Sequence, residues 1–291
     1  MNPSSTTASP PRNEILTTIE PSRGWFSFDW NEFWSYRGLV SLLAKRNITI
    51  TYKQTILGPA WFLIQPVITS VVFSVIFGRV AGIETDGIPR MLFYMSGLLG
   101  WNYFLGVATG AGRSLVQSKA LVSKIWFPRL VLPTAFVLSN LAYLALNFLI
   151  FAGFYVYFAA NGCPLRPTAA ALLLPLVIVW IAAFGLGIGL LVAALTAKYR
   201  DLSFSMPFIM QMWMYATPVI YPVRGVRDPL FLAILKFNPM GPVTEILRFA
   251  LMGRGTIDWG TIGCGLAVTV AALVLGFGAF NRAQRVVADH L

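Results

Sequence analysis

The sequence predicts an all-α membrane protein, with an N-terminal amphipathic interface helix followed by six transmembrane helices. Only 11% of its 291 residues are charged, whereas an ordinary soluble domain is about a quarter charged. The mean hydropathy of +0.70 is equally extreme, so the chain lacks the polar residues that a water-facing surface needs. Its apolar residues gather in six long segments. Each is about as long as a helix that crosses the roughly 30 Å hydrocarbon core of a bilayer.

These segments divide the chain. Residues 1–22 are rich in Ser, Thr and Pro, which predicts a disordered tail. Residues 23–56 combine apolar residues at helical spacing with aromatic and basic ones. This pattern is typical of a helix lying in the cytoplasmic interface, although a helix packed on a soluble partner would also fit. Residues 57–285 form one membrane domain. Its predicted spans are 57–80, 91–115, 131–158, 169–197, 202–220 and 260–280.

The positions of Lys and Arg predict that both termini are cytoplasmic, because short cytoplasmic loops are enriched in these residues. In this orientation the short outer loops contain only Arg79, Arg90 and Arg166, and Glu84 and Asp86 offset the first two. The first 55 residues lack a compact apolar core, so we expect no cleavable signal peptide. The cytoplasmic side receives Arg37, Lys45, Arg46, Lys53, Arg113, Lys119, Lys124, Arg129, Lys198, Arg200, Arg282 and Arg285.

Composition argues against several functions. A net charge of +11 raises nucleic acid as a partner, but the cations lie between apolar runs. Retention of loops beside anionic lipid explains them better, and we expect no nucleic-acid binding. Cys163, Cys264 and His290 provide no metal-ligand spacing. The two cysteines can form a disulfide if both lie near the outer face, but two unpaired thiols are the favoured alternative.

The sequence shows no catalytic chemistry of its own. None of the six lysines follows a glycine, so the chain has no phosphate-binding loop for ATP hydrolysis. The cores of the spans contain no ionisable residue, which argues against a proton- or sodium-coupled carrier. We therefore expect no catalytic residue, no cofactor and no metal on this chain. If a cargo moves through it, another chain must supply the energy. A passive channel remains an alternative, although no filter-like run is evident.

The loop at 116–130 combines an apolar ridge with cations. Within QSKALVSKIWF, two apolar pairs are each four residues apart, so they share one face of a short helix that a proline then ends. Such a helix can enter a groove on a soluble partner, but cations that merely retain the loop inside would look the same. The pairs are Leu121 with Ile125 and Val122 with Trp126. The cations are Lys119, Lys124 and Arg129.

Two further segments have ambiguous patterns. In the loop 197–207, Arg200 and Asp201 can contact a partner or each other, or anchor the membrane edge. The segment 222–258 contains two apolar runs, 230–237 and 243–252, that are each too short to cross. We expect them to re-enter the membrane or lie in the interface, either as an outer gate or without any gating role. Asn238 and Pro239 separate the runs, and Glu245 with Arg248 form an i, i+3 pair typical of a local brace.

Five stretches in order resemble the permease subunits of ABC-type exporters for bacterial cell-surface polysaccharides. They cover roughly residues 34–285 and fall on the topology given above. YKQTILGPAWFLIQP (52–66) and SGLLGWNYF (96–104) are similar to the first two spans of that family. The later stretches resemble its coupling loop, its fifth span and its outer segment. They are KALVSKIWFPRLVLP (119–133), YRDLSFSMPFIMQMWMYATPVIYP (199–222) and FNPMGPVTEILRFALMG (237–253).

The resemblance implies a multi-pass permease of the cytoplasmic (inner) membrane. It implies a homodimer with two copies of a separate ATPase subunit, which binds ATP and Mg. The implied cargo is an undecaprenyl-linked glycan, most plainly O-antigen, with capsule or teichoic acid as alternatives. Residues implied to couple to the ATPase are Lys119, Leu121, Lys124, Ile125, Trp126, Arg129, Arg200 and Asp201. Residues implied at the outer gate are Asn238, Pro239, Glu245 and Arg248.

Aromatic residues make up 14% of the chain and suit a glycan path, because sugar C–H faces pack against aromatic rings. Trp and Tyr also collect at membrane interfaces, so we expect only some of them to meet cargo. A permease for a small amphiphile, which needs a compact pocket instead, and a passive channel or structural membrane protein are the competing hypotheses. The candidate path residues are Trp61, Phe62, Tyr94, Trp101, Tyr103, Phe104, Trp213, Tyr215 and Tyr221.

Overall fold

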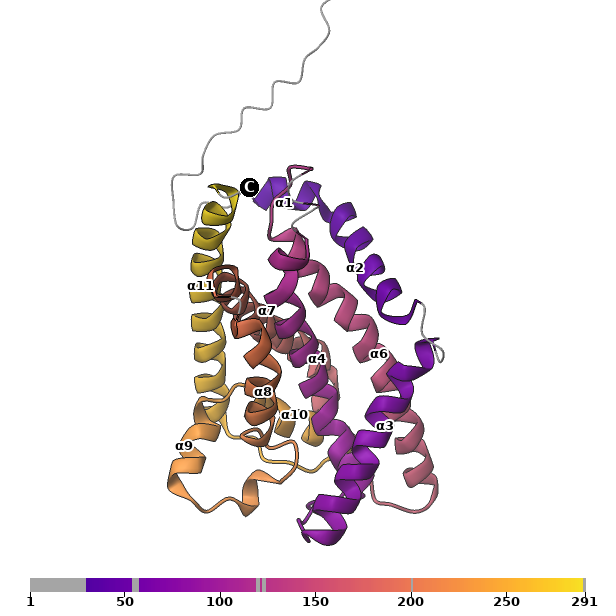
Figure 1. Cartoon of the computed structure of the whole chain (residues 1–291). Helices are drawn as coiled ribbons and strands as arrows, with labels where there is room; N and C mark the ends of the chain where they lie inside the picture. Colours follow the sequence, from indigo (N-terminus) through magenta and orange to yellow (C-terminus); the bar gives the residue numbers. More distant parts are fainter. Residues whose placement is uncertain (1–29, 54–57, 119–120, 122–123, 200, 290–291) are drawn as a thin grey trace, which may run out of the picture.

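The computed structural model describes residues 30–53, 58–118, 121, 124–199 and 201–289, and these ranges contain helices and no β-strand. This confirms the predicted all-α class (Figure 1). The elements are α1 (Trp30–Ser35), α2 (Arg37–Tyr52), η1 (Gly58–Ala60), α3 (Trp61–Phe73), η2 (Ser74–Val80), α4 (Arg90–Gln117), α6 (Val131–Ala160), η3 (Ala169–Leu173), α7 (Leu174–Lys198), α8 (Asp201–Tyr215), η4 (Val223–Gly225), α9 (Pro229–Phe237), α10 (Met240–Met252) and α11 (Trp259–Asp289).

Five of the described helices are long and apolar enough to cross a membrane. They confirm five of the six predicted spans, and their bounds are Leu63–Val80, Arg90–Gln117, Val131–Ala160, Ala169–Lys198 and Trp259–Gln284. The predicted span 202–220 forms α8, which is shorter because it ends at Tyr215, ahead of Pro218. The predicted outer segment forms α9 and α10, which meet at 83° as a broken span or a re-entrant loop.

Local sequence explains where these shorter helices begin and end. Asp228 accepts a hydrogen bond from the backbone N–H of Phe231 at 2.8 Å and so caps α9, while Pro229 occupies its first turn. Gly253 ends α10 in the left-handed conformation, with φ of 68°. The Asn238–Pro239 pair lies at the sharp bend between the two helices.

The core is built around α4 and α7, which are packed along each other, with α11 on the far side of α7 and α10 against both α4 and α7. Glycines on α7 allow this close approach. A Cβ atom at Gly187 would lie 2.8 Å from backbone atoms of Ala272 and Leu273 on α11. Close contact between backbones is how helices associate in lipid, where burying apolar surface gives no advantage over contact with lipid tails.

The helices α3 and α6 lie at the periphery of this core. Only 11% of the α3 span window is buried, against 78% of the α4 window. The helix α3 contains Pro66, which cannot donate a backbone hydrogen bond, and it continues into the π-helical turn η2. The helix α2 packs against α6, which agrees with the helix predicted ahead of the first span.

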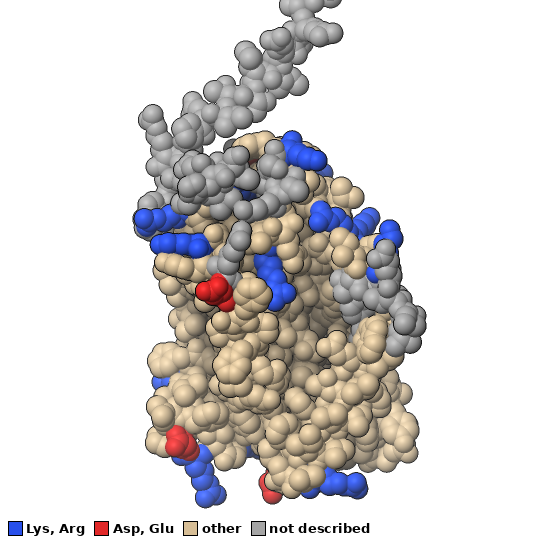
Figure 2. All heavy atoms as spheres, in the orientation of Figure 1, with Lys and Arg blue, Asp and Glu red and all other residues tan. Residues whose placement is uncertain are grey.

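The molecule has two distinct ends. In Figure 1 the helix α1, the start of α6 and the end of α11 lie together, and we call this the α1 end. The helix α9, the start of α4 and the start of α11 lie at the opposite, α9 end. Figure 2 shows Lys and Arg gathered towards the α1 end of this face, while the α9 end carries cations and acids together. A band with little charge separates the two ends, as a membrane-spanning protein requires.

The close approach of α7 and α11 gives the first prediction. Gly187→Leu should lower the thermal stability of the detergent-purified protein, because the new side chain meets the α11 backbone. Overpacking of this kind costs about 1–3 kcal/mol. The control is Gly153→Leu on α6, where a Cβ atom would meet nothing within 4 Å. Equal melting temperatures for the two variants would contradict this account of the core.

Candidate functional site

The loop between α4 and α6 lies at the α1 end, and buried contacts with neighbouring helices hold it in place. The backbone N–H of Ile125 donates to the carbonyl of Leu121 at 3.2 Å, which is a helical turn as the spacing predicted. Phe127 is buried with Leu43 and Phe280, so the loop rests on α2 and α11. Lys119 and Val122 lie outside the described residues.

Two apolar side chains project from this anchored loop. Ile125 is 57% exposed and Trp126 is 54% exposed, and the neighbouring Lys124 is also exposed. Leu121 is partly buried and packs against the core, so among the described ridge residues Ile125 and Trp126 are the ones available to a partner. Adjacent exposed apolar residues beside a cation are a feature of interaction surfaces.

Arg129 has a different role from the other cations of the loop. Its guanidinium donates a hydrogen bond to the backbone carbonyl of Gln284, near the C-terminal end of α11. Cations are favoured at helix C-termini, where backbone carbonyls are unpaired. Burial lowers the pKa of Arg129 from its usual value, but an arginine remains charged at neutral pH. The loop is therefore tied to the last helix.

The second predicted coupling contact is only partly described. Arg200 lies outside the described residues. Asp201 is exposed in the first turn of α8, where a negative charge is favoured by the helix dipole. Lys198, at the end of α7, lies 5.1 Å from the ring centroid of its neighbour Tyr199. These side chains therefore leave the start of α8 accessible.

Four of the aromatic candidates for the glycan path lie in the core instead. Trp101 is 2% exposed, and Tyr94, Tyr103 and Phe104 are also buried. Phe104 stacks on Phe184 of α7 with ring centroids 5.1 Å apart. All four lie on α4, the most buried span, so their rings present no surface to a cargo. In this structure they contribute to helix packing, and the expectation that they meet cargo stays a prediction.

The remaining aromatic candidates lie nearer the surface. Trp61 on α3 is 49% exposed, and Tyr215 on α8 is 43% exposed. Tyr221 is half-buried, its hydroxyl donates to the carbonyl of Tyr215 at 3.3 Å, and burial raises its pKa above the usual value. The Phe62 side chain lies outside the described residues. The exposed candidates therefore come from α3 and α8.

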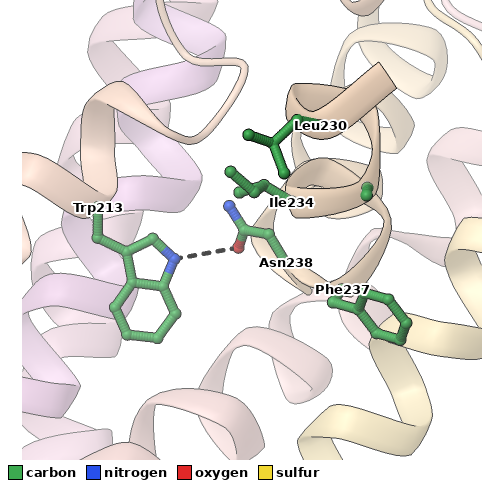
Figure 3. Close-up of a pocket in the computed structure, with 6 residues that line it drawn as sticks. Trp213, Leu230, Ile234, Phe237 and Asn238 are labelled. Carbon is green, nitrogen blue, oxygen red and sulfur yellow. Dashed lines mark hydrogen bonds between the residues drawn. The ribbon is translucent and has the colours of Figure 1, made fainter. Parts of the chain in front are cut away.

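Trp213 connects the core to an open hollow between α8 and α9. Its ring contacts Phe104 and Phe184, with centroids 5.4 and 5.7 Å away. The hollow has a volume of about 440 Å³, and Figure 3 shows Trp213 facing α9 across it. Its walls are mostly apolar, and the indole N–H donates to Asn238 at 3.2 Å. The lining residues are Trp213, Leu230, Ala233, Ile234, Phe237 and Asn238.

The pair predicted as a local brace is buried at the α9 end. Arg248 is 1% exposed and donates to Glu245 at 3.0 Å and to the carbonyl of Val219 at 3.0 Å. Its guanidinium also lies 3.6 Å from the centroid of the Phe93 ring, a cation–π contact. The second carboxylate oxygen of Glu245 accepts from the N–H and hydroxyl of Thr256, at 2.8 and 2.9 Å. The pair therefore joins α10, α4 and two loops.

This network separates the two halves of the predicted gate. Nearly every residue of α10 is buried, whereas Leu235 is the buried residue of α9. The helix α10 is therefore firmly packed and α9 only loosely, and a gate at this segment stays a prediction.

Sequence reasoning missed the contacts that fix these segments. The Arg129–Gln284 bond and the Asn238 contacts join residues far apart in the chain, and no spacing rule reveals them. The signal available at Asn238 was a polar residue and a proline between two apolar runs. Cys163 and Cys264 are free thiols, which confirms the favoured alternative. In the part of the chain that is described, no group of His, Cys, Asp and Glu could hold a metal ion.

The buried ion pair gives the second prediction. Arg248→Met should destabilise the protein by about 3–5 kcal/mol, because it leaves the Glu245 carboxylate buried without its cation. The double variant Arg248→Met/Glu245→Gln should lose less than the sum of the two single variants. Arg254→Met, an exposed arginine two residues beyond α10, is the control. Thermal unfolding in lipid nanodiscs measures the stability of all four variants. If the losses of the two single variants simply add in the double variant, the coupling between Arg248 and Glu245 is contradicted.

Comparisons with known proteins agree with this architecture. The ABC-2 type transporter family matches residues 38–252. The O-antigen export system permease protein RfbA of Myxococcus xanthus is 30% identical over 211 residues, which cover 72% of this chain and 78% of that protein. Two proteins of the same name from Klebsiella pneumoniae are 25% and 24% identical, and each match covers 84% of this chain and 91% of the relative.

The family match includes α2, the spans from α3 to α8, and the outer helices α9 and α10. It thus covers the anchored loop, the hollow and the buried ion pair described above. The resemblance that five short stretches suggested is confirmed over most of the chain. With five long apolar helices that cross the membrane, this chain belongs to the ABC-2 type transporter family and is a multi-pass inner-membrane permease subunit that is not itself an enzyme.

Proposed function

We propose that this chain is the membrane permease of an ATP-driven exporter that moves a lipid-linked polysaccharide of the O-antigen class across the inner membrane. The names of the relatives support the cargo, and their matches cover most of each protein. The observation that carries the proposal is the projecting pair Ile125 and Trp126, a docking surface on a chain without a nucleotide site of its own.

The proposed orientation places the α1 end in the cytoplasm, with both termini inside. Support comes from the cations gathered at that end, which the cytoplasmic side retains (Figure 2). In this orientation the loop at 116–130 and the start of α8 face the cytoplasm, where the ATPase subunit and its ATP and Mg are available. The α9 end then lies on the outer side.

Force from the ATPase would enter through the loop at 116–130. Trp126 and Ile125 would fill an apolar groove on the ATPase, and Lys119 and Lys124 would meet acidic groups at its rim. Phe127 and Arg129 tie the loop to the helices beneath it, so the loop can act as a rigid lever. Asp201 and Arg200 would form the second contact.

We further propose a homodimer with two ATPase subunits and a glycan path between the two permease copies. The helices α3 and α8 would face that path, and their exposed aromatic residues Trp61 and Tyr215 would contact sugar rings. Trp213 and Tyr221 would line its outer part. The helix α9 would close the outer mouth, with Asn238 and Pro239 at its base and the Glu245–Arg248 pair holding α10 still.

The docking surface gives the third prediction. Replacing Ile125 and Trp126 by Ser should weaken binding of the ATPase subunit about 30-fold or more, since buried aromatic anchors contribute about 2 kcal/mol each or more. Co-purification and ATPase stimulation in nanodiscs measure the effect. Trp259→Ser, which removes an exposed tryptophan at the α9 end, is the matched control. Undiminished binding of the double variant would remove this loop from the mechanism.

The path gives the fourth prediction, which separates aromatic residues at the surface from those in the core. Trp61→Ala and Tyr215→Ala should slow glycan export while leaving the melting temperature of the complex unchanged. Trp101→Ala should instead destabilise the fold by about 3–5 kcal/mol, the usual cost of removing a buried aromatic ring. Surface glycan and thermal unfolding are measured on the same variants. Normal surface glycan in the first two would assign those rings to the lipid interface.

A further inference from the structure

Asn238 lies at the bend between α9 and α10, but its side chain is bonded to the end of α8. Its Nδ2 group donates to the hydroxyl of Thr217 at 2.8 Å and to the carbonyl of Ala216 at 3.3 Å. Its Oδ1 atom accepts from the indole N–H of Trp213 at 3.2 Å and from the backbone N–H of Met240 at 3.1 Å. Asn238 is buried, so these bonds form away from water.

The Asn238 side chain uses its full hydrogen-bonding capacity, because an amide side chain has two N–H donors and one oxygen with two acceptor sites. All four are used, three towards the end of α8 and one towards α10. Thr217 adds a closing bond, since its hydroxyl donates to the carbonyl of Trp213 at 2.9 Å. A fully satisfied polar network in a low-dielectric site is stronger and more rigid than an isolated hydrogen bond.

The helix α9 has few other restraints. It packs on α11, but Leu235 is its buried residue, and Leu230 and Phe237 are largely exposed. The hollow lies between Trp213 of α8 and one face of α9, as Figure 3 shows. Asn238 therefore supplies the hydrogen bonds between this corner and the end of α8, and the ring contact of Phe231 with Tyr221, at 5.7 Å between centroids, is a second contact between α9 and the segment after α8.

The helix α8 is suited to transmit movement between the two ends. Its first residue, Asp201, follows the second inner loop, and its last turn carries Trp213 into the corner. It packs less extensively on α4 and α7 than these two helices pack on each other. Arg248 holds α10 to α4 through the Phe93 ring, and it also donates to the Val219 carbonyl in the segment after α8. A displacement of α8 would therefore reach α9 through Asn238, whereas α10 has the additional contact of Arg248 with Phe93 that holds it to α4.

We propose that Asn238 is a positioning residue that joins α9 to α8, so that the two helices move as one body when cargo is released. The inference rests on the proposed function, because it assigns the path by which movement at the cytoplasmic loops reaches the outer gate. Asn238 itself need not touch the glycan.

The first test removes the bond and measures coupling. Thr217→Val takes away the hydroxyl that receives the Asn238 amide, and Thr217→Ser keeps it. In reconstituted complexes with the ATPase, Thr217→Val should lower the glycan exported per ATP hydrolysed about fivefold, the factor for one net hydrogen bond. Thr217→Ser should restore it. The control is Thr244→Val, a buried threonine whose hydroxyl bonds only within α10.

The second test replaces the hydrogen bonds by a covalent bond. In a Cys163→Ser/Cys264→Ser background, Thr217→Cys and Asn238→Cys place two thiols where the hydroxyl and amide now meet. While the two thiols are reduced, this complex should hydrolyse ATP but export little glycan. Oxidised, it should recover export, because α8 and α9 are joined again. Gel mobility or mass spectrometry reports whether the disulfide has formed.

The outcomes separate this inference from the proposed function. Export that falls further on oxidation would mean that α8 and α9 move apart, and would overturn the inference. An unchanged ratio of export to hydrolysis in Thr217→Val would overturn it as well. If the parent complex hydrolyses ATP but exports no glycan, the proposed function fails, whatever the variants do.

Discussion

The α9 end is held together by the guanidinium of Arg248. It is a buried cation in a chain with very few charges, and it is stable there because Glu245, the Val219 carbonyl and the Phe93 ring surround it. Removal of any partner would leave a charge in a medium that solvates it poorly, which is why such groups are rarely buried alone. This cluster fixes α10 to α4, whereas α9, the other helix of the α9 end, has a single buried residue.

A similar contrast between closely packed and loosely packed helices is found in the rest of the described structure. The helices α4, α7, α10 and α11 form a core whose glycines allow backbones to touch, and such contacts resist sliding. The helices α3, α8 and α9 have few buried residues, and α3 and α8 each contain an internal proline. Regions with few buried contacts open at lower free energy than the core. The exposed aromatic candidates for the glycan path, Trp61 and Tyr215, lie on the second group.

Much of the fold could be predicted from composition and charge, because the bilayer permits few solutions. The long spans, the short helices after residue 222 and the free thiols followed from length, spacing and residue type. Burial did not. In a membrane, a lipid-facing side chain and a core-facing one are both apolar, so hydropathy cannot tell Trp61 from Trp101. The polar contacts of Asn238 and Arg129 depend on helices from distant parts of the chain, which local spacing does not reveal.

The helices differ greatly in length, and the lipid must adapt to this. The 30 residues of α6 extend about 45 Å, whereas the 15 residues of α8 extend only about 22 Å. A helix longer than the hydrocarbon core tilts, and a shorter one draws the two leaflets towards each other. In the proposed arrangement, with the path beside α8, the bilayer there would be locally thinned, with headgroups and water closer to its midplane. A hydrophilic polymer crossing at this place would meet a shorter stretch of hydrocarbon than elsewhere, and its transfer rate should depend on the acyl-chain length of the surrounding lipid.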